Sequence, residues 1–179
     1  MREATIEPEQ RDRIAAVARA LAGELEDSRP DAPAVEPREA PPIVCLSARD
    51  AFDAVGARLL AAELSRRGWP VAVEGESKLV GEVVEGIQEE RTSVVCISSV
   101  RPTQFLHLRT LCKRILLADP GVQIVLGLWG EDLQCADLQQ RLTASPRVHI
   151  VNTLADAVEQ SAGIAGPSVA TPALRTKVV

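Results

Sequence analysis

Residues 43–68 read IVCLSARDAFDAVGARLLAAELSRRG, an apolar run followed by a longer segment that ends on glycine. The run Ile43–Leu46 predicts a short buried strand, and Asp50–Arg67 predicts a helix that stops at Gly68. A strand followed by a helix is the repeating part of a parallel sheet, so the fold depends on whether the pattern recurs.

The strand-and-helix pattern does recur along the chain. Further strands are predicted at 71–73, 93–97, 122–126 and 148–151, and further helices at 78–90, 104–118, 132–143 and 154–162. Continuous apolar strands separated by single helices are typical of a parallel sheet that is covered on both faces. Right-handed crossovers between five such units favour the strand order 2-1-3-4-5. We therefore expect an α/β fold, a flavodoxin-like three-layer αβα sandwich around a five-stranded parallel sheet.

Two segments precede this domain and one follows it. Apolar residues recur at threes and fours in the first segment, including Ile14, Val17 and Leu21, and predict an amphipathic helix. That helix is either solvated or lightly packed, or it mediates dimerisation or ends an upstream segment. Five prolines without periodicity predict an extended linker after it. The expected organisation is a helix at 1–27, a linker at 28–42, the α/β domain at 43–163 and a flexible tail at 164–179.

Composition excludes several classes of function. A net charge of −5 argues against a general nucleic-acid binder, and aromatic residues are only 2% of the chain, so platforms for base stacking are missing as well. The four cysteines include no CxxC pair, and neither of the two histidines is spaced with them as in a zinc site. We expect reduced cysteines, with Cys45 and Cys96 packed as small apolar side chains.

The ends and hydropathy of the chain predict its location. The N-terminus is charged and lacks the apolar region of a signal peptide, and no run approaches the ~20 apolar residues that span a bilayer. We expect a cytoplasmic protein without a transmembrane segment in this chain. This expectation leaves open that the chain is part of a larger membrane protein.

A ligand crevice is expected outside the carboxyl ends of strands one and three, where the winding of the sheet reverses. Arg49 and Arg101 near this crevice either pair with an anionic ligand or lie in water. Trp129, between Gly127 and Gly130, either lines a pocket or interface or covers the top of the core. The loops expected at this edge are 47–50, 98–102, 127–130 and 152–153.

The chemistries that this fold often supports lack their residues here. The turn SARDAFDAVG after strand one has side chains at every close-approach position for a pyrophosphate, and only Ser47 suits a flavodoxin-type phosphate loop. A phosphoacceptor domain needs an aspartate where strand three ends in Ser98-Ser99 and a lysine where strand five ends in Asn152-Thr153. No G-x-S-x-G elbow is present to support a nucleophilic hydrolase.

The remaining polar side chains have structural interpretations. Asp50 is expected to cap the helix after strand one, with Asp53 completing a capping box. His107 is expected on the surface of the helix after strand three or partly packed there, too far along to serve as a base for the serines. His149 is expected to be a hydrogen-bonded histidine of strand five.

The stretches VCLSARDAFDAVGARLLAAELSRRG, VVCISSV and IVLGLWG together resemble the cobalamin-binding domain family, over about residues 43–151. That family carries Asp-x-His-x-x-Gly after strand one, Ser-x-Leu at the end of strand three and Gly-Gly after strand four. Gly56 matches the motif glycine, Ser98 with Val100 matches Ser-x-Leu, and Gly127 matches the first glycine of the pair. The resemblance implies a flavodoxin-like cobalamin-binding domain.

Three motif positions depart from the family. Asp53 stands in place of the cobalt-ligating histidine, Ala51 in place of its aspartate partner, and Leu128 in place of the second glycine. Without an imidazole, histidine-on ligation is excluded. Cobalamin then remains a candidate cofactor only in a base-on or histidine-independent mode.

The stretches CLSARD, VVCIS and LCKRIL…IVLGLWG are also similar to the cytosolic C-terminal domain of some proteobacterial permeases of the autoinducer-2 exporter-like family. In such proteins a helix and a proline-rich linker would follow the membrane part, much as residues 1–42 precede the sheet here. This resemblance implies a bacterial regulatory domain tethered to a membrane protein.

These observations favour a non-enzymatic ligand-sensing or regulatory domain that binds a small molecule or a protein partner, and not nucleic acid. One alternative is a protein-interaction module that forms homo-oligomers through the N-terminal helix. Another is a small enzyme that uses Arg49, Asp50, Ser98 and Ser99. The candidate ligand-binding residues are Ser47, Asp50, Asp53, Gly56, Ser98, Ser99, Val100, Gly127, Trp129 and Gly130. No metal-ligating residue is assigned.

Overall fold

The computed structural model describes residues 40–74, 80–100, 105–129 and 145–166, together with scattered positions between 10 and 23. The helix predicted at 132–143 lies outside these ranges, as do Arg101, Gly130, Cys135, nearly all of the predicted linker and the segment after residue 166. The described positions between 10 and 23 are helical, and Ile14 and Val17 are 43% and 60% exposed. None of the described helices combines the length and apolarity that a bilayer crossing needs.

The sheet has five strands, and every neighbouring pair is parallel. The strand order β2-β1-β3-β4-β5 confirms the predicted flavodoxin-like topology. The chain first goes from β1 to β2 on one side of β1. It then crosses to β3 on the other side and continues outward to β4 and β5, so the winding reverses between β1 and β3. The strands are β1 (Ile43–Ser47), β2 (Val71–Glu74), β3 (Val94–Ser99), β4 (Gln123–Leu128) and β5 (Val148–Val151).

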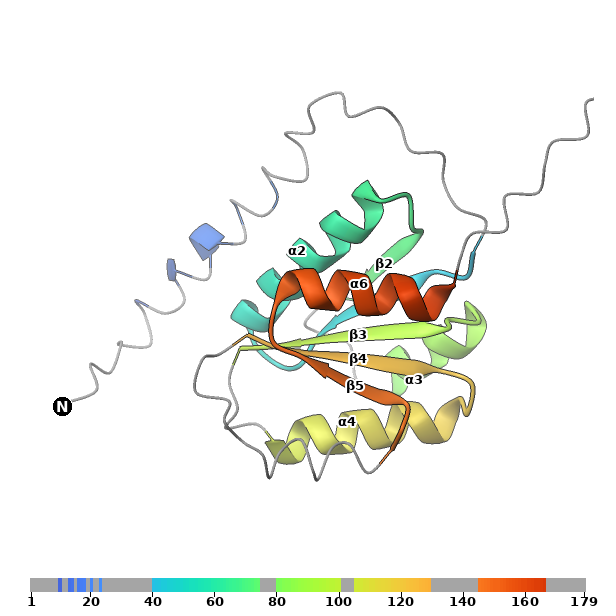
Figure 1. The fold of residues 1–179 in the computed structure, drawn as a ribbon. Helices are drawn as coiled ribbons and strands as arrows, with labels where there is room; N and C mark the ends of the chain where they lie inside the picture. The colour runs from blue at the N-terminus through green and yellow to red at the C-terminus, as the bar shows by residue number, and fades with distance from the viewer. Residues whose placement is uncertain are drawn as a thin grey trace, which may run out of the picture.

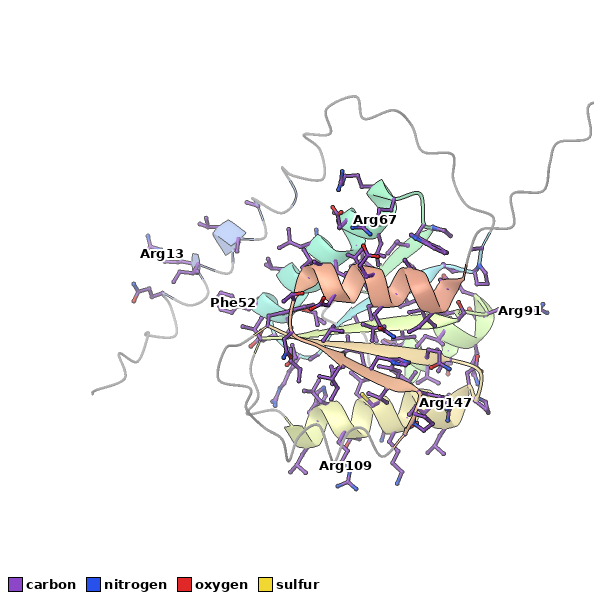
Figure 2. All side chains as sticks on the ribbon, viewed as in Figure 1. Arg13, Phe52, Arg67, Arg91, Arg109 and Arg147 are labelled. Carbon is purple, nitrogen blue, oxygen red and sulfur yellow. The ribbon has the colours of Figure 1, made fainter. Side chains whose placement is uncertain are left out.

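Helices cover both faces of the sheet, which confirms the three-layer sandwich. The helices α2 and α6 pack on one face, and α3 and α4 pack on the other (Figure 1). Figure 2 shows Arg67, Arg91 and Arg109 at the periphery of these layers. The helices are α2 (Ala51–Arg66), α3 (Val80–Glu89), α4 (Phe105–Ala118) and α6 (Leu154–Ala165).

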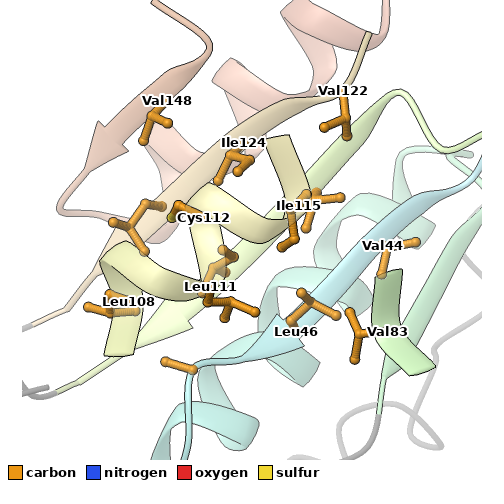
Figure 3. Close-up of a cluster of buried hydrophobic side chains, with 14 of the residues drawn as sticks. Val44, Leu46, Val83, Leu108, Leu111, Cys112, Ile115, Val122, Ile124 and Val148 are labelled. Atoms are coloured by element: carbon orange, nitrogen blue, oxygen red, sulfur yellow. The ribbon is translucent and has the colours of Figure 1, made fainter. Parts of the chain in front are cut away.

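The alternation of side chains along each strand divides the core into two apolar layers. In β1, Ile43 and Cys45 pack against α2 and α6, whereas Val44 and Leu46 pack against α3 and α4. Figure 3 shows the layer beneath α3 and α4, which is built almost entirely from Val, Leu and Ile. The near absence of aromatic residues is therefore accommodated by close-packed aliphatic side chains.

The start of α2 follows the prediction from the sequence. Asp50 is the N-cap residue, and its carboxylate accepts hydrogen bonds from the backbone N–H groups of Phe52 and Asp53. The Asp53 carboxylate in turn accepts from the backbone N–H of Asp50, which completes the capping box. Two donors that the first helical turn leaves unpaired are satisfied in this way.

Five elements extend further than the sequence predicts, β1 and β2 by one residue each and β3, β4 and the last helix by two or three. The strand β3 continues through Ser98 and Ser99, and β4 continues through Gly127 and Leu128, where loops were expected. Pairing explains both extensions, because Ser98 aligns with Gly127 and Ser99 aligns with Leu128. The last helix, predicted to stop at residue 162 before a tail, runs on to Ala165 and ends at Gly166, whose φ of +84° suits glycine.

Candidate functional site

Four strands contribute one aligned row of residues at the carboxyl edge of the sheet. Ser47, Ser98, Gly127 and Val151 are register partners across β1, β3, β4 and β5. Their positions in the alternation put them on the face that α2 and α6 cover. Two small hydroxyl residues and a glycine leave room above the middle of this row.

The indole of Trp129 fills that room. Its Nε1–H donates a 2.7 Å hydrogen bond to Ser98 Oγ, and its backbone N–H donates a 3.0 Å bond to the carbonyl of Ser99. The benzo ring covers Gly127 so closely that a Cβ on this glycine would overlap its Cζ2 and Cη2 atoms. Trp129 is thus fixed through both its backbone and its side chain.

A glycine of α2 closes the space from the helix side. A Cβ at Gly56 would lie 2.7 Å from the Trp129 Nε1 atom and would also overlap Ser98 Oγ. Such contacts are too short for any real side chain, so only glycine lets the helix approach here. We call the space bounded by Gly56, Ser98 and Gly127 the aromatic slot.

Asp53 lies one helical turn before Gly56 and is fully buried, at 0% exposure. Its Oδ1 accepts a 2.7 Å hydrogen bond from the backbone N–H of Val100. Its Oδ2 accepts from the backbone N–H groups of Arg49 and Asp50, at 3.0 and 3.2 Å. The carboxylate therefore joins the β1–α2 connection to the end of β3.

Burial raises the pKa of Asp53 above its ordinary value of 3.8. The hydrogen bond from the Val100 N–H acts in the opposite direction, and the nearby carboxylate of Asp50 adds to the upward shift. The net direction is upward because the loss of hydration outweighs the donors. The Asp53 carboxylate thus gains three backbone hydrogen bonds but loses hydration. Its contribution to the stability of the domain therefore depends on pH.

The other predicted site residues are not all brought together. Ser99 is buried like Ser98 but alternates to the opposite face of β3, the face under α3 and α4. Arg49 is exposed, and the Asp50 side chain is engaged in capping. Arg101 and Gly130 lie outside the described residues. The crevice suggested for an enzyme therefore does not gather Ser98 and Ser99 on one face.

His107 and Val151 also belong to this edge, although neither was among the candidate ligand-binding residues. The Nε2–H of His107 donates to the carbonyl of Ala48 at 2.8 Å, so the start of α4 is tied to the β1–α2 connection. Val151 extends the aligned row onto β5. The sequence signal for His107 was its position near the start of the helix predicted at 104–118. His149, as expected, is hydrogen-bonded, at 3.1 Å from Gln123 Oε1.

Within the described ranges, no three His, Cys, Asp or Glu side chains converge as metal ligands would. The buried thiols of Cys45 and Cys96 lie on adjacent, aligned strand positions, and Cys96 Sγ lies 3.1 Å from Ser161 Oγ. They pack in the apolar layer under α2 and α6, as the sequence predicts.

Two solved structures share this architecture. One is a cobalamin-binding protein from Desulfitobacterium hafniense DCB-2, with a TM-score of 0.55, 17% identity and 68% of this chain covered. The other is the monomethylamine corrinoid protein of Methanosarcina barkeri, with a TM-score of 0.59, 18% identity and 87% of this chain covered. The chain spans 58% of the first structure and 70% of the second. No protein-family model and no curated protein sequence matches the chain.

The fold is thus the flavodoxin-like α/β fold that these corrinoid-binding and cobalamin-binding proteins also have. The residue at position 53 does not fit a corrinoid whose cobalt is ligated by an imidazole at that position. At the position where the resembling motif has histidine, the Asp53 carboxylate is buried and accepts three backbone hydrogen bonds. The motif residues Gly56, Ser98 and Gly127 do converge, but they converge on the indole of Trp129.

Proposed function

We propose that the α/β domain is a non-enzymatic ligand-sensing or regulatory domain that acts through the carboxyl edge of β1, β3 and β4. The observation that supports this proposal is the aromatic slot, in which two glycines and one serine hydroxyl hold a flat aromatic group by shape and one hydrogen bond. This arrangement leaves no accessible reactive group in the slot, because Ser98 is 1% exposed and its hydroxyl already accepts the Nε1–H of Trp129.

The two structural neighbours support a corrinoid as the first ligand to test. Because a buried Asp53 stands in place of the motif histidine, the mode that we propose is a base-on or histidine-independent one, with cobalamin docked at the outer edge. Exposed Arg49 in the β1–α2 connection would then contact the bound molecule. The proposal includes a cytoplasmic location and attachment to a bacterial membrane protein, as the resemblance to permease domains implies.

The test is co-elution of hydroxocobalamin and adenosylcobalamin with the full chain at tens of micromolar, followed by absorbance. We expect retention of at least one corrinoid with its own axial base in place. Arg49→Ala should weaken this retention, and Arg109→Ala, on the exposed side of α4, should not. Absence of retention for both corrinoids removes them as ligands. Equal retention by the two variants would contradict binding at the proposed edge.

A second candidate function is self-association or docking through the N-terminal helix, which is favoured by the exposure of Ile14 and Val17. Apolar side chains on a helix are commonly buried by a partner helix. Deleting residues 1–27 should then lower the number of chains per particle, calculated from the mass measured by light scattering. An unchanged number of chains per particle would leave the ligand-sensing proposal as the better account.

A further inference from the structure

The two helices that cover one face of the sheet carry opposite charges. The helix α3 contains three glutamates and no basic residue, whereas α4 contains two arginines, one lysine and no acidic residue. Because α3 and α4 lie side by side over the same apolar layer, this side of the domain has an acidic half and a basic half. We call the outer surfaces of α3 and α4 the two-helix face. Its exposed charged residues are Glu82, Glu85 and Glu89 on α3 and Arg109, Lys113 and Arg114 on α4.

Two large apolar side chains project from the basic half. Leu106 and Leu117 are 75% and 72% exposed, more than any other large apolar residue that the structure describes. They are about three helical turns apart, so they lie on one stripe of α4 together with Lys113. Figure 2 shows Arg109, beside this stripe, pointing away from the domain. Apolar residues that recur along the outer stripe of a helix are typical of a surface that a partner covers.

The acidic and basic halves are held at matching heights. Both helices connect parallel strands, so they run in the same direction. Gln88 Nε2, in the last turn of α3, donates a 2.8 Å hydrogen bond to the carbonyl of Ala118 at the end of α4. At about 1.5 Å per residue, Glu85 lies about 4.5 Å before Gln88, and Arg114 lies about 6 Å before Ala118. Glu85 is therefore about level with Lys113 and Arg114.

We propose that the two-helix face is an interface with a second copy of this chain, related by a two-fold axis that runs between α3 and α4 and parallel to them. Rotation about this axis places α3 of each copy over α4 of the other and keeps the height of every residue. The acidic half of each copy then meets the basic half of the other, so the charge pairs occur twice. Glu85 lies opposite the partner's Lys113, and the partner's α3 covers Leu106 and Leu117.

The charges favour a second copy over other partners. An anionic lipid surface would attract α4 but would repel the glutamates of α3 on the same face. A protein surface of one sign has the same difficulty with one of the two halves. A second copy presents both signs in complementary places, as a two-fold interface requires. This inference goes beyond the proposed function, because it concerns a different surface and needs no ligand.

The size of the face predicts a weak dimer. The helices have 10 and 14 residues and are about 15 and 21 Å long. Interfaces at the small end of the size range belong to transient complexes, so we expect a dissociation constant on the order of 10–100 μM. Salt should weaken the dimer, because raising the ionic strength from about 0.1 to about 1 M shortens the screening length from about 10 to about 3 Å. Sedimentation velocity of the full chain over a series of concentrations measures both effects.

Charge reversal tests the reciprocal arrangement. In the full chain, Lys113→Glu and Glu85→Lys each place like charges opposite one another twice per dimer, so each should weaken association by at least about tenfold. An equimolar mixture of the two variants restores opposite charges at both places in the mixed dimer, so it should associate about as strongly as the wild type. The matched control is Arg58→Glu, which reverses an exposed cation of α2 on the other face of the sheet and should have no effect.

The exposed leucines provide a second measurement. Leu117→Ser should weaken the dimer, and it should leave the melting temperature of the dilute monomeric chain unchanged, because Leu117 is 72% exposed. A lower melting temperature with unchanged association would instead show that Leu117 serves the fold of its own chain and would contradict its place in the interface. Corrinoid retention by Lys113→Glu should equal that of the wild type, so this inference and the proposed function can fail separately.

Four results would overturn the inference. The first is a wild-type chain that stays monomeric at concentrations well above the expected dissociation constant. The second is a mixture of Lys113→Glu and Glu85→Lys that associates no better than either variant alone. The third is loss of association in Val17→Asp but not in Lys113→Glu, which would assign the interface to the N-terminal helix. The fourth is a monomeric chain that sediments with phosphatidylserine vesicles and loses this binding in Lys113→Glu, which would assign the face to lipid.

Discussion

Asp53 Oδ1 accepts a 2.7 Å hydrogen bond from the backbone N–H of Val100, a residue 47 positions further along the chain. This bond crosses the point where the winding of the sheet reverses and joins the β1–α2 connection to the end of β3. The carboxylate at this position is therefore a structural tie between the two segments that border the candidate site.

Replacing this carboxylate with its neutral isostere should destabilise the domain. In Asp53→Asn, one oxygen remains to accept a hydrogen bond, but the amide NH₂ faces backbone N–H donors on the other side. We expect a loss of about 1–3 kcal/mol in the free energy of unfolding, measured by urea denaturation. Glu90→Gln, which removes an exposed carboxylate, should change it by less than about 0.5 kcal/mol. Equal effects of the two substitutions would contradict the tie.

The raised pKa of Asp53 predicts how its contribution varies with pH. Because the folded state holds the proton more tightly than the unfolded state, the contribution is most favourable at low pH. The unfolding free energy of the wild type minus that of Asp53→Asn should therefore decrease as the pH rises from about 3.8 through the raised pKa of the folded state, and then become constant. A difference that increases over this window would show that the backbone donors dominate.

Two helix glycines should respond to alanine in opposite directions. At Gly86 in α3, an added Cβ meets nothing closer than a flexible Glu74 oxygen at 3.9 Å, so Gly86→Ala should stabilise the domain by about 0.5–1 kcal/mol. At Gly56 in α2, the Cβ overlaps Ser98 Oγ and the Trp129 indole, so Gly56→Ala should destabilise it by about 1–3 kcal/mol. Thermal unfolding of both variants measures the contrast. Stabilisation by both would show that the slot is loosely packed.

Arg147 caps the end of α4. Its Nη2 donates to the carbonyl of Leu116 in the last turn, at 3.5 Å, and its Nη1 donates to the carbonyls of Pro120 and Asp119 just after the helix, at 2.7 and 3.3 Å. Figure 2 shows the residue beside that helix end. A cation at this position satisfies free carbonyls and opposes the helix dipole. Arg147→Met should therefore lower the unfolding free energy by about 1 kcal/mol, whereas Arg109→Met on the exposed side of α4 should leave it nearly unchanged. A similar loss in both would exclude a specific capping role.

The buried thiols should resist modification in the folded state. Burial raises the pKa of Cys112 from 9.0 to about 12, so at pH 8 its thiolate fraction is about a thousandfold below that of an unperturbed thiol. Cys45 and Cys96 are buried as well, at 0% and 1% exposure. Site-resolved mass spectrometry after iodoacetamide treatment should find all three unmodified until denaturant is added. Rapid native labelling of Cys112 would contradict this packing.

The sequence predicted the fold well and the site only in part. Apolar runs and the spacing of helices were sufficient for the strand order, the bounds of β5 and the capping of α2 by Asp50. The carboxyl ends of β3 and β4 were missed because Ser98, Ser99 and Gly127 are residues that also favour loops, and only pairing across the sheet keeps them extended. The convergence of Gly56 and Gly127 on one indole was not predictable, because it depends on how closely α2 approaches the sheet.

The arrangement around Asp53 and Trp129 also determines which substitutions this edge of the sheet can tolerate. An imidazole introduced at position 53 alone would leave backbone N–H groups of Arg49, Asp50 and Val100 without their acceptor. A smaller residue at position 129 alone would leave a cavity over Gly127. Each change alone is expected to destabilise the domain, because the first leaves buried donors unpaired and the second leaves an unfilled cavity.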